Sequence, residues 1–447
     1  MTQCIQQLCF GNLHGKQVTA AFDGGNVSTD GGLLLVAEAD RKLGLTRTLG
    51  DCLRDTRQAA KVSHPFTDML AQRVYQIACG YEDCNDADDL RYDPMFKTAV
   101  GRLPASGSDL ASQPTLSRFE NSISRTQLLR LANALADRVL DQYAGQTPER
   151  IILDFDGTDD PTHGQQQLTG FNGFYDEHCY LPLIATARID GGPDELLAVM
   201  LRPGKIHGAA NALPVLKRLV AKLRQRWPEV TIVFRADDGF GKPEIYDWCE
   251  DNAVGYLISL AQNSRLLAIA EPWMEAARAE YEETGEKVRY VHETRYAAGG
   301  WRYGRRVVVK AEVMTEGDNP RFVVTNLVGG GPEDLYDEYS MRGEQENRIK
   351  ELKNDLQIDR TSCHRFVANQ FRVLLHAMAF VLLSHLRKHL TGTDLARAQV
   401  CTLQRHLLKL GVRVRETARR IWLHFASNCP AQDLWPELLS RMRAAPA

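Results

Sequence analysis

The sequence predicts an α/β fold: a central sheet flanked by helical segments towards both ends of the chain. Three observations support this class. Amphipathic helical patterns fill much of the first 143 residues, apolar strand patterns begin near Glu149, and strands then alternate with helices. The chain has 447 residues, 44% of them hydrophobic and 25% charged, which is ordinary for a globular protein of about three domains.

Composition excludes several classes of protein. No run approaches the roughly 18 apolar residues of a membrane span, and the N-terminus lacks the pattern of a signal peptide. We therefore expect a cytoplasmic protein with no membrane partner. Ten cysteines are scattered singly and form no Cys-x2-Cys pair, so we expect reduced thiols instead of a zinc finger or a disulfide framework.

The charge distribution points to an anionic partner. The formal net charge is only −3, but residues 342–447 hold 18 Lys and Arg against 9 Asp and Glu. A basic segment of this kind is the electrostatic footprint of a DNA-binding protein. The alternative is a solvated basic surface.

The first 146 residues read as a helical N-terminal DNA-binding domain. Helical patterns cover Pro65 to Gly80 and residues 124–143. Between them, Ser108-Asp109 and Ser112 with Pro114 are candidate starts of two short helices, which predicts a helix-turn-helix with Arg118 facing DNA. Many helical hairpins share this pattern, so a purely structural pair is the alternative. A break at residues 145–149 ends the domain.

Residues 147–262 form the first part of a predicted catalytic core. Three strand patterns come first, with Gly191-Gly192 as a hairpin turn, and are followed by helix, strand, helix and strand. That order is typical of an RNase H-like (retroviral integrase-like) fold, whose first and fourth strands lie side by side. Acids at the ends of those two strands would then converge.

The two strands do end in acids. Asp154 and Asp156 share one face of the first strand, and Asp237 precedes Asp238 at the end of the fourth. Burying carboxylates close together is costly unless a cation compensates them. Oxygen ligands without a Cys/His set favour Mg²⁺ or Mn²⁺. Which acid of each pair binds metal stays open.

The stretch from Asp337 to Leu356 reads as one helix, because helix formers dominate it. Within it, an arc of about 60° holds one polar stripe, formed by Tyr339, Arg342, Glu346 and Lys353. A separate apolar stripe for packing consists of Met341, Ile349, Leu352 and Leu356. A carboxylate between two bases suits metal held beside phosphate, whereas the alternative is a solvated helix with incidental ion pairs.

The spacing Tyr-x2-Arg-x3-Glu-x6-Lys resembles the signature of bacterial insertion-sequence DDE transposases. Asp156-Gly157-Thr158 resembles their Asp-x-Thr motif. The run DDPTHGQQ and the motif from Arg235 to Phe240 resemble the insertion-sequence family numbered thirteen-eighty, except that Asp238 replaces its Ser. The resemblance implies that Asp156, Asp237 and Glu346 are catalytic and bind metal, with Asp154 as the less favoured metal ligand. It also implies that Tyr339, Arg342 and Lys353 grip DNA, and Lys350 is a further candidate on the same helix.

The remaining domain boundaries follow the same resemblance. Residues 263–333 are similar to the β-rich insertion of this class, in which Trp301 is a candidate for stacking on DNA; cross-strand packing is the alternative. Residues 334–390 would complete the core around the Glu346 helix. Residues 391–447 form a basic C-terminal region with helical and strand-like patterns.

These expectations define one hypothesis and two rivals. The hypothesis is a transposase that binds the terminal inverted repeats of its element, cleaves them by two-metal hydrolysis and joins the 3′-hydroxyl ends to target DNA. It implies double-stranded DNA as partner, a homodimer in a synaptic complex and a cytoplasmic, nucleoid-associated location. The rivals are an RNase H-like nuclease without strand transfer and a non-catalytic, transposase-derived DNA-binding protein.

Overall fold

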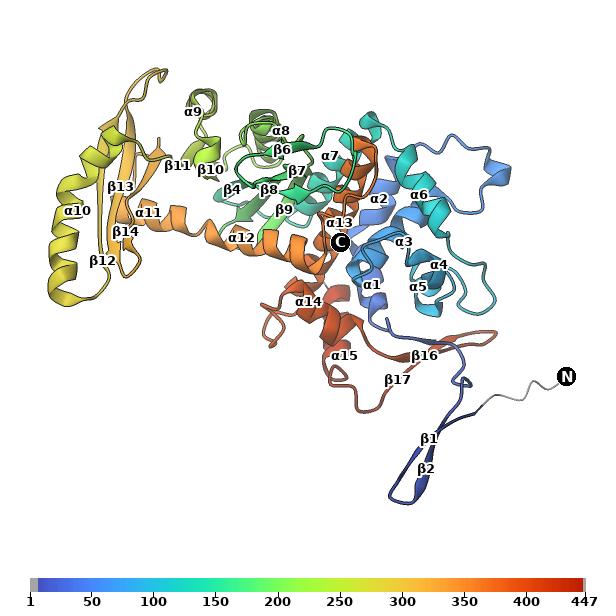
Figure 1. Cartoon of the computed structure of the whole chain (residues 1–447). Coiled ribbons are helices and arrows are strands. Elements are labelled where there is room, and N and C mark those ends of the chain that lie inside the picture. Colours follow the sequence, from blue (N-terminus) through green and yellow to red (C-terminus); the bar gives the residue numbers. More distant parts are fainter. Residues whose placement is uncertain (1–6, 445–447) are drawn as a thin grey trace. The chain divides into compact units, whose positions relative to one another are not determined.

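The computed structural model describes residues 7–444 and shows a mixed α/β protein that contains many helices and a large mixed sheet (Figure 1). The chain divides into two compact units. One contains the chain up to Ala134 together with Asn354–Arg360 and Leu374–Ala447, and the other contains Leu135–Lys353 and Thr361–Val373. We call them the terminal unit and the sheet unit. The five-part division expected from the sequence stays a prediction.

The sheet unit is organised around a nine-stranded sheet with the order β12-β13-β15-β11-β10-β4-β8-β9, in which β14 pairs with β13. Its strands are β4 (Arg150–Gly157), β8 (Leu183–Ile189), β9 (Asp194–Met200), β10 (Thr231–Ala236), β11 (Gly255–Leu260), β12 (Val288–Tyr296), β13 (Arg305–Met314), β14 (Gly317–Asp318) and β15 (Arg321–Thr325). β10 runs parallel to both β4 and β11, and the other pairs are antiparallel. The expectation that the first and fourth strands are neighbours is confirmed.

Apolar residues explain why this centre is buried. In β4 and β10 Phe155 and Phe234 are fully buried, and their rings meet edge to face at 5.1 Å. Strands covered on both faces need such near-continuous apolar runs. The β8–β9 hairpin turns at Gly191, whose φ of 73° suits glycine, as expected. Helices α8 (Ala212–Arg226) and α9 (Pro243–Asp251) connect the parallel strands, and a small three-stranded sheet contains β5 (Asp160–Pro161), β6 (Gly170–Asn172) and β7 (Glu177–Tyr180).

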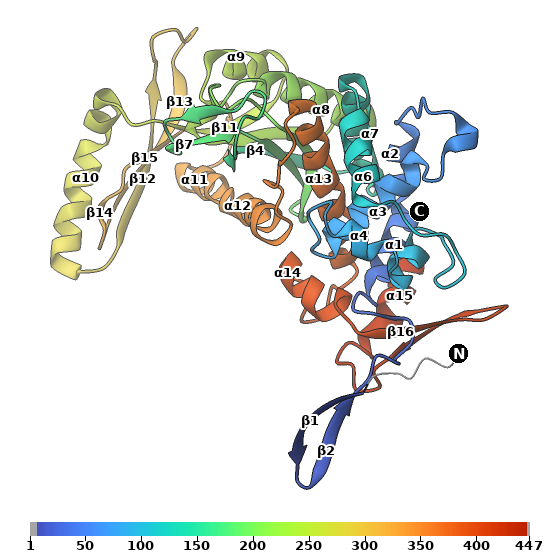
Figure 2. The same cartoon turned by 45° about the vertical axis from the view of Figure 1, so that its right-hand side comes forward.

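Residues 263–333 are less purely β-rich than the sequence suggested. Their strands extend the main sheet, and they begin with the 21-residue helix α10 (Ser264–Thr284). α10 packs against β12 and β13, as both views show (Figures 1 and 2). Asn263 caps its first turn and Gly285, with φ of 67°, ends it.

The predicted long helix is interrupted. It starts earlier than expected as α11 (Pro332–Ser340), turns at residues 341–342, and resumes as α12 (Gly343–Lys350) and a π-helical turn, η3 (Glu351–Asp355). Ile349, Leu352 and Leu356 are buried as expected, but Met341 is 51% exposed. The prediction for Met341 is wrong because the turn removes it from the apolar stripe.

The terminal unit is mainly helical. It contains α1 (Leu33–Leu43), α2 (Leu45–Asp51), η1 (Ala59–Lys61), α3 (Phe66–Ala78), α4 (Ala87–Leu90), α5 (Pro94–Ala99), α6 (Gln113–Ser122), α14 (Val400–Leu403), η4 (Gln404–Leu408) and α15 (Leu434–Ala444). Its strands are the hairpin β1 (Leu8–Leu13) with β2 (Lys16–Ala20), and the sheet β17 (Ile421–Phe425), β16 (Val412–Glu416) and β3 (Val27–Ser28). Helices α7 (Arg125–Asp141) and α13 (Phe366–Lys388) continue from one unit into the other.

One expectation for these helices needs correction. No helix forms within residues 101–112, so the first half of the predicted helix-turn-helix is wrong, although α6 does begin directly after Ser112. Among the described residues, α13 is the one helix that is long and apolar enough to cross a membrane. Of its most apolar stretch, 83% is buried inside the protein, as in the core helix of a globular protein.

Candidate functional site

The neighbouring ends of β4 and β10 bring two acids together. β4 and β10 are parallel and in register, with Phe155 opposite Ala236, so Asp156 and Asp237 follow at the same edge of the sheet. Asp237 lies just beyond the strand and accepts a hydrogen bond from the backbone N–H of Gly239 at 2.9 Å. Asp238 is exposed in the short 3-10 turn that follows. The geometry thus favours Asp237 over Asp238 as the partner of Asp156.

Asp154 has a different environment from Asp156. It lies directly opposite Arg235 in the β4–β10 register, and the guanidinium bonds both of its carboxylate oxygens, one of them at 2.7 Å. Both side chains are 1% exposed. Arg235 also donates to the backbone carbonyl of Glu338, so this buried pair joins β4, β10 and α11. The Asp154 carboxylate is therefore occupied by a structural partner.

Arg342 connects the turn before α12 to the acids. Its guanidinium donates to Asp156 at 2.7 Å and lies 3.4 Å from the Glu346 carboxylate. The charges of Asp156 and Asp237 act to raise the pKa of Arg342, against the opposing effect of burial. One permanent cation thus faces all three predicted catalytic acids.

Burial strongly perturbs the two aspartates. Desolvation raises the pKa of Asp156 to about 6, helped by the charge of Asp237 and opposed by Arg342. Burial likewise raises the pKa of Asp237, again opposed by Arg342 and helped by its neighbour Asp238. Buried carboxylates that lie close together are destabilised in their ionised form unless positive charge compensates them.

Glu346 is not gathered into the same cluster. Its side chain is 50% exposed, and it reaches the aspartates only through Arg342. Within residues 7–444, no three His, Cys, Asp or Glu side chains lie close enough to hold a metal ion. The donor chemistry nevertheless fits a hard divalent cation. The acids offer oxygen ligands, and Arg342 does not fully compensate the negative charge of the buried Asp156 and Asp237. The three-acid site stays a prediction.

Lys353, Tyr339 and Arg118, three of the other predicted DNA contacts, have partners within the protein. Lys353 forms an ion pair with Asp159 at 2.8 Å. Tyr339 packs against an apolar cluster that includes Leu335 and Tyr336. Lys350 is exposed. In the terminal unit, Arg118 is exposed and its guanidinium donates to the Thr115 hydroxyl at 3.2 Å.

Trp301 is half-buried in an aromatic group on the extended part of the sheet. Its ring meets those of Tyr246 and Tyr296 edge to face, at 5.4 and 5.7 Å. The Arg305 guanidinium lies 5.1 Å from the Trp301 ring and pairs with Asp247 and Glu250. The observed contacts of Trp301 are therefore those of the packing alternative, and its contact with DNA stays a prediction.

Two residues near the acids were missed as functional candidates. Arg202 is 1% exposed and donates to the carbonyls of Leu181 and Ala210 at 2.7 and 3.0 Å, with burial lowering its pKa to about 10. Asp159 is the partner of Lys353. No sequence signal identified Arg202, whereas the run of acids after β4 did include Asp159.

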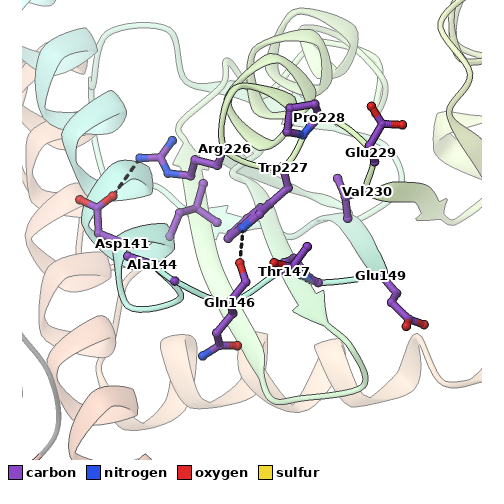
Figure 3. Close-up of a pocket in the computed structure, with 13 residues that line it drawn as sticks. Asp141, Ala144, Gln146, Thr147, Glu149, Arg226, Trp227, Pro228, Glu229 and Val230 are labelled. Carbon is purple, nitrogen blue, oxygen red and sulfur yellow. Dashed lines mark hydrogen bonds and ion pairs between the residues drawn. The ribbon is translucent and has the colours of Figure 1, made fainter.

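A cavity of about 640 Å³ lies elsewhere in the sheet unit. It is lined by the segments that lead into β4 and β10, where the Trp227 indole donates to the Gln146 carbonyl and Arg226 pairs with Asp141 (Figure 3). Asp156 and Asp237 lie at the opposite ends of these strands. The cavity is therefore not part of the acidic site.

Comparison with known families identifies the chain. A family model described as Transposase DDE domain group 1 matches residues 10–447, which is nearly the whole sequence. No curated protein matches the chain.

Proposed function

The chain belongs to the Transposase DDE domain group 1 family, and on that premise we propose that it cleaves the terminal inverted repeats of its own insertion sequence and joins them to target DNA. The observation that carries the proposal is the meeting of Asp156 and Asp237 at the ends of β4 and β10, with Arg342 between them and Glu346. The finer assignment is an RNase H-like core of the insertion-sequence family numbered thirteen-eighty. The adjacency of β4 and β10 supports that assignment.

Each acid has a defined part in the proposed site. Asp156, Asp237 and Glu346 would hold Mg²⁺ or Mn²⁺, and Glu346 would have to approach the aspartates from its exposed position. Such ions supply Lewis-acid catalysis for phosphodiester hydrolysis and strand transfer. Asp154 is excluded from the proposed ligands because Arg235 occupies both of its oxygens.

The chemistry consists of two displacements at phosphorus. Water first replaces the 3′-oxygen at the transposon end, which leaves as a 3′-hydroxyl. That hydroxyl then attacks a phosphodiester of target DNA and releases a second 3′-oxygen. Arg342 and Lys353 would bind the anionic backbone, as would Lys350, and neither displacement needs a covalent bond between protein and DNA.

The assembly and location follow from the same proposal. Two ends cut in concert require two active sites, hence a homodimer in a synaptic complex on double-stranded DNA. Residues 1–146, including Arg118, and the basic residues 391–447 would contact DNA outside the active site, and 263–333, with Trp301, would contact it near the cut. A protein with this substrate would work in the cytoplasm, associated with the nucleoid.

A strand-transfer assay tests the proposal. The substrates are a duplex from the DNA that flanks the reading frame and a supercoiled target, with Mg²⁺ or Mn²⁺ added. Wild-type protein should give products joined to target, and Glu346→Gln should lower both cleavage and joining by at least about 100-fold, because the loss of a residue that only supports a metal ligand already costs about 10–100-fold. Glu344→Gln, on the same helix but paired with Arg188, is the matched control and should stay active.

Each alternative gives a different result. Cleavage without joined products identifies the nuclease. Binding to the flanking DNA without cleavage identifies the non-catalytic DNA-binding protein. Full activity of Glu346→Gln would refute the site assignment.

A further inference from the structure

The two bases of the polar stripe each have an acidic partner in the segment at the end of β4. Arg342 pairs with Asp156 at 2.7 Å, and Lys353 pairs with Asp159 at 2.8 Å. Both pairs are well covered, with side chains 16% and 12% exposed in the first and 22% and 22% exposed in the second. The groups predicted to grip phosphate therefore already hold carboxylates.

The environment of Asp159 shows that its pair with Lys353 is strong enough to matter. Burial acts to raise the pKa of Asp159, yet the pKa is lowered overall, because Lys353 donates a hydrogen bond and supplies positive charge. The Thr158 hydroxyl adds a donor at 3.3 Å. Glu177 lies beside Asp159, and its own pKa is raised by burial and by the Asp159 charge. Without the positive charge of Lys353, the Asp159 and Glu177 carboxylates would lie beside each other uncompensated.

We propose that Asp159 is an intramolecular competitor of DNA: it occupies Lys353 in place of a phosphate and must release it when a transposon end enters. This inference rests on the proposed function. It concerns a residue outside the three predicted ligands, so it can be tested without metal or catalysis.

The physical reason is an exchange of partners. Lys353 gains little when it trades one anionic partner for another, and the released Asp159 then repels the phosphate. DNA that contacts this part of the protein through a single phosphate therefore gains no net attraction at Lys353. A duplex whose other contacts place a phosphate at Lys353 can complete the exchange, but its affinity is then lower by the free energy of the Lys353–Asp159 pair that it opens.

The test measures binding of full-length protein to two labelled duplexes in EDTA, by fluorescence anisotropy. One duplex carries the DNA that flanks the reading frame, and the other is scrambled, with the same length and composition. Asp159→Asn should tighten binding to the flanking duplex by about two- to fivefold, the contribution of a partly exposed ion pair. It should tighten binding to the scrambled duplex by no more than this, because the free energy of the pair is the most that either duplex can recover.

A double-mutant cycle with Lys353→Gln identifies the cause. If Asp159 acts through Lys353, Asp159→Asn tightens binding less in the Lys353→Gln background than in the wild type. Glu344→Gln removes one negative charge from α12 but affects only Arg188, which lies outside the stripe and keeps its pair with Asp194, so it should not reproduce the gain. Asp159→Glu keeps the negative charge and should keep the wild-type affinities for both duplexes. It is also the variant to measure if Asp159→Asn does not fold.

Three results overturn the inference. They are weaker or unchanged binding of the flanking duplex by folded Asp159→Asn, a gain of equal size in the Lys353→Gln background, and tighter binding of either duplex by Asp159→Glu. A wild-type protein that binds both duplexes equally would instead count against the proposed function, and the inference would fall with it.

Discussion

Asp154 and Asp156 are two residues apart, yet we expect their Asn variants to change stability in opposite directions. Asp154 forms a bidentate pair with Arg235, and both side chains are 1% exposed. Removing one partner of such a pair leaves a buried, uncompensated charge and costs about 3–5 kcal/mol. Asp154→Asn should therefore lower the free energy of unfolding by about that amount.

Asp156→Asn should stabilise the fold at neutral pH. The pKa of Asp156 is raised from 3.8 to about 6 by burial and by Asp237, even with Arg342 present. Between these pH values the folded protein keeps a proton that the unfolded chain has lost, so the ionisation penalty is absent below about pH 4 and complete above about pH 6. The shift corresponds to at most about 3 kcal/mol. Asn mimics the protonated acid and avoids this penalty.

Urea unfolding followed by circular dichroism, at pH 7.5 and at pH 4, measures both effects. At pH 7.5 Asp156→Asn should be more stable than wild type, and at pH 4 the difference should vanish. Asp154→Asn should be less stable at pH 7.5. If Asp156→Asn were destabilised at pH 7.5, or if Asp154→Asn unfolded like wild type, our distinction between a strained site acid and a structural acid would be refuted.

Two further predictions concern the fold. The pKa of His385 is lowered from 6.5 to about 3, mainly by burial and also by His389, so the folded state resists a proton that the unfolded chain accepts. Stability should therefore fall as the pH drops below 6.5 towards 3, by about 2–4 kcal/mol, and urea unfolding of His385→Gln should show a smaller fall. Gly204→Ala would place a Cβ 2.0 Å from the Cys179 carbonyl oxygen, so its melting temperature should drop, with a cost of about 2 kcal/mol. Gly173→Ala, which meets no atom within 4 Å, should melt like wild type.

The succession of strands and helices from β4 to β11 was predictable because its signals are local. The apolar run of β4, the glycine turn at Gly191 and the alternation with α8 and α9 each need only neighbouring residues. The parallel pairing of β4 with β10 then follows from the order of elements, and it places Asp156 near Asp237. For these reasons the core of the candidate site could be located before any contact was known.

Other features depend on contacts between distant residues. Period-two alternation puts Asp154 and Asp156 on one face, and only the cross-strand position of Arg235 separates their roles. The turn at 341–342 interrupts a sequence that consists almost entirely of helix formers, so propensity alone predicts one helix. Helix α10 did have a local signal in its Ala- and Glu-rich sequence, which the strand patterns after it obscured.

The charges around Arg342 lead to a last prediction. Three ionised carboxylates and one guanidinium leave a formal deficit of two positive charges, which one divalent ion balances. A second ion would leave the site with excess positive charge unless anionic phosphate entered with it. In the absence of DNA we therefore expect calorimetric titration with Mn²⁺ to show one site per chain, and a second to appear with the flanking duplex. Arg342→Gln removes one positive charge and should tighten binding of the first ion; unchanged affinity in this variant would show that Arg342 does not compete with the metal for the acids.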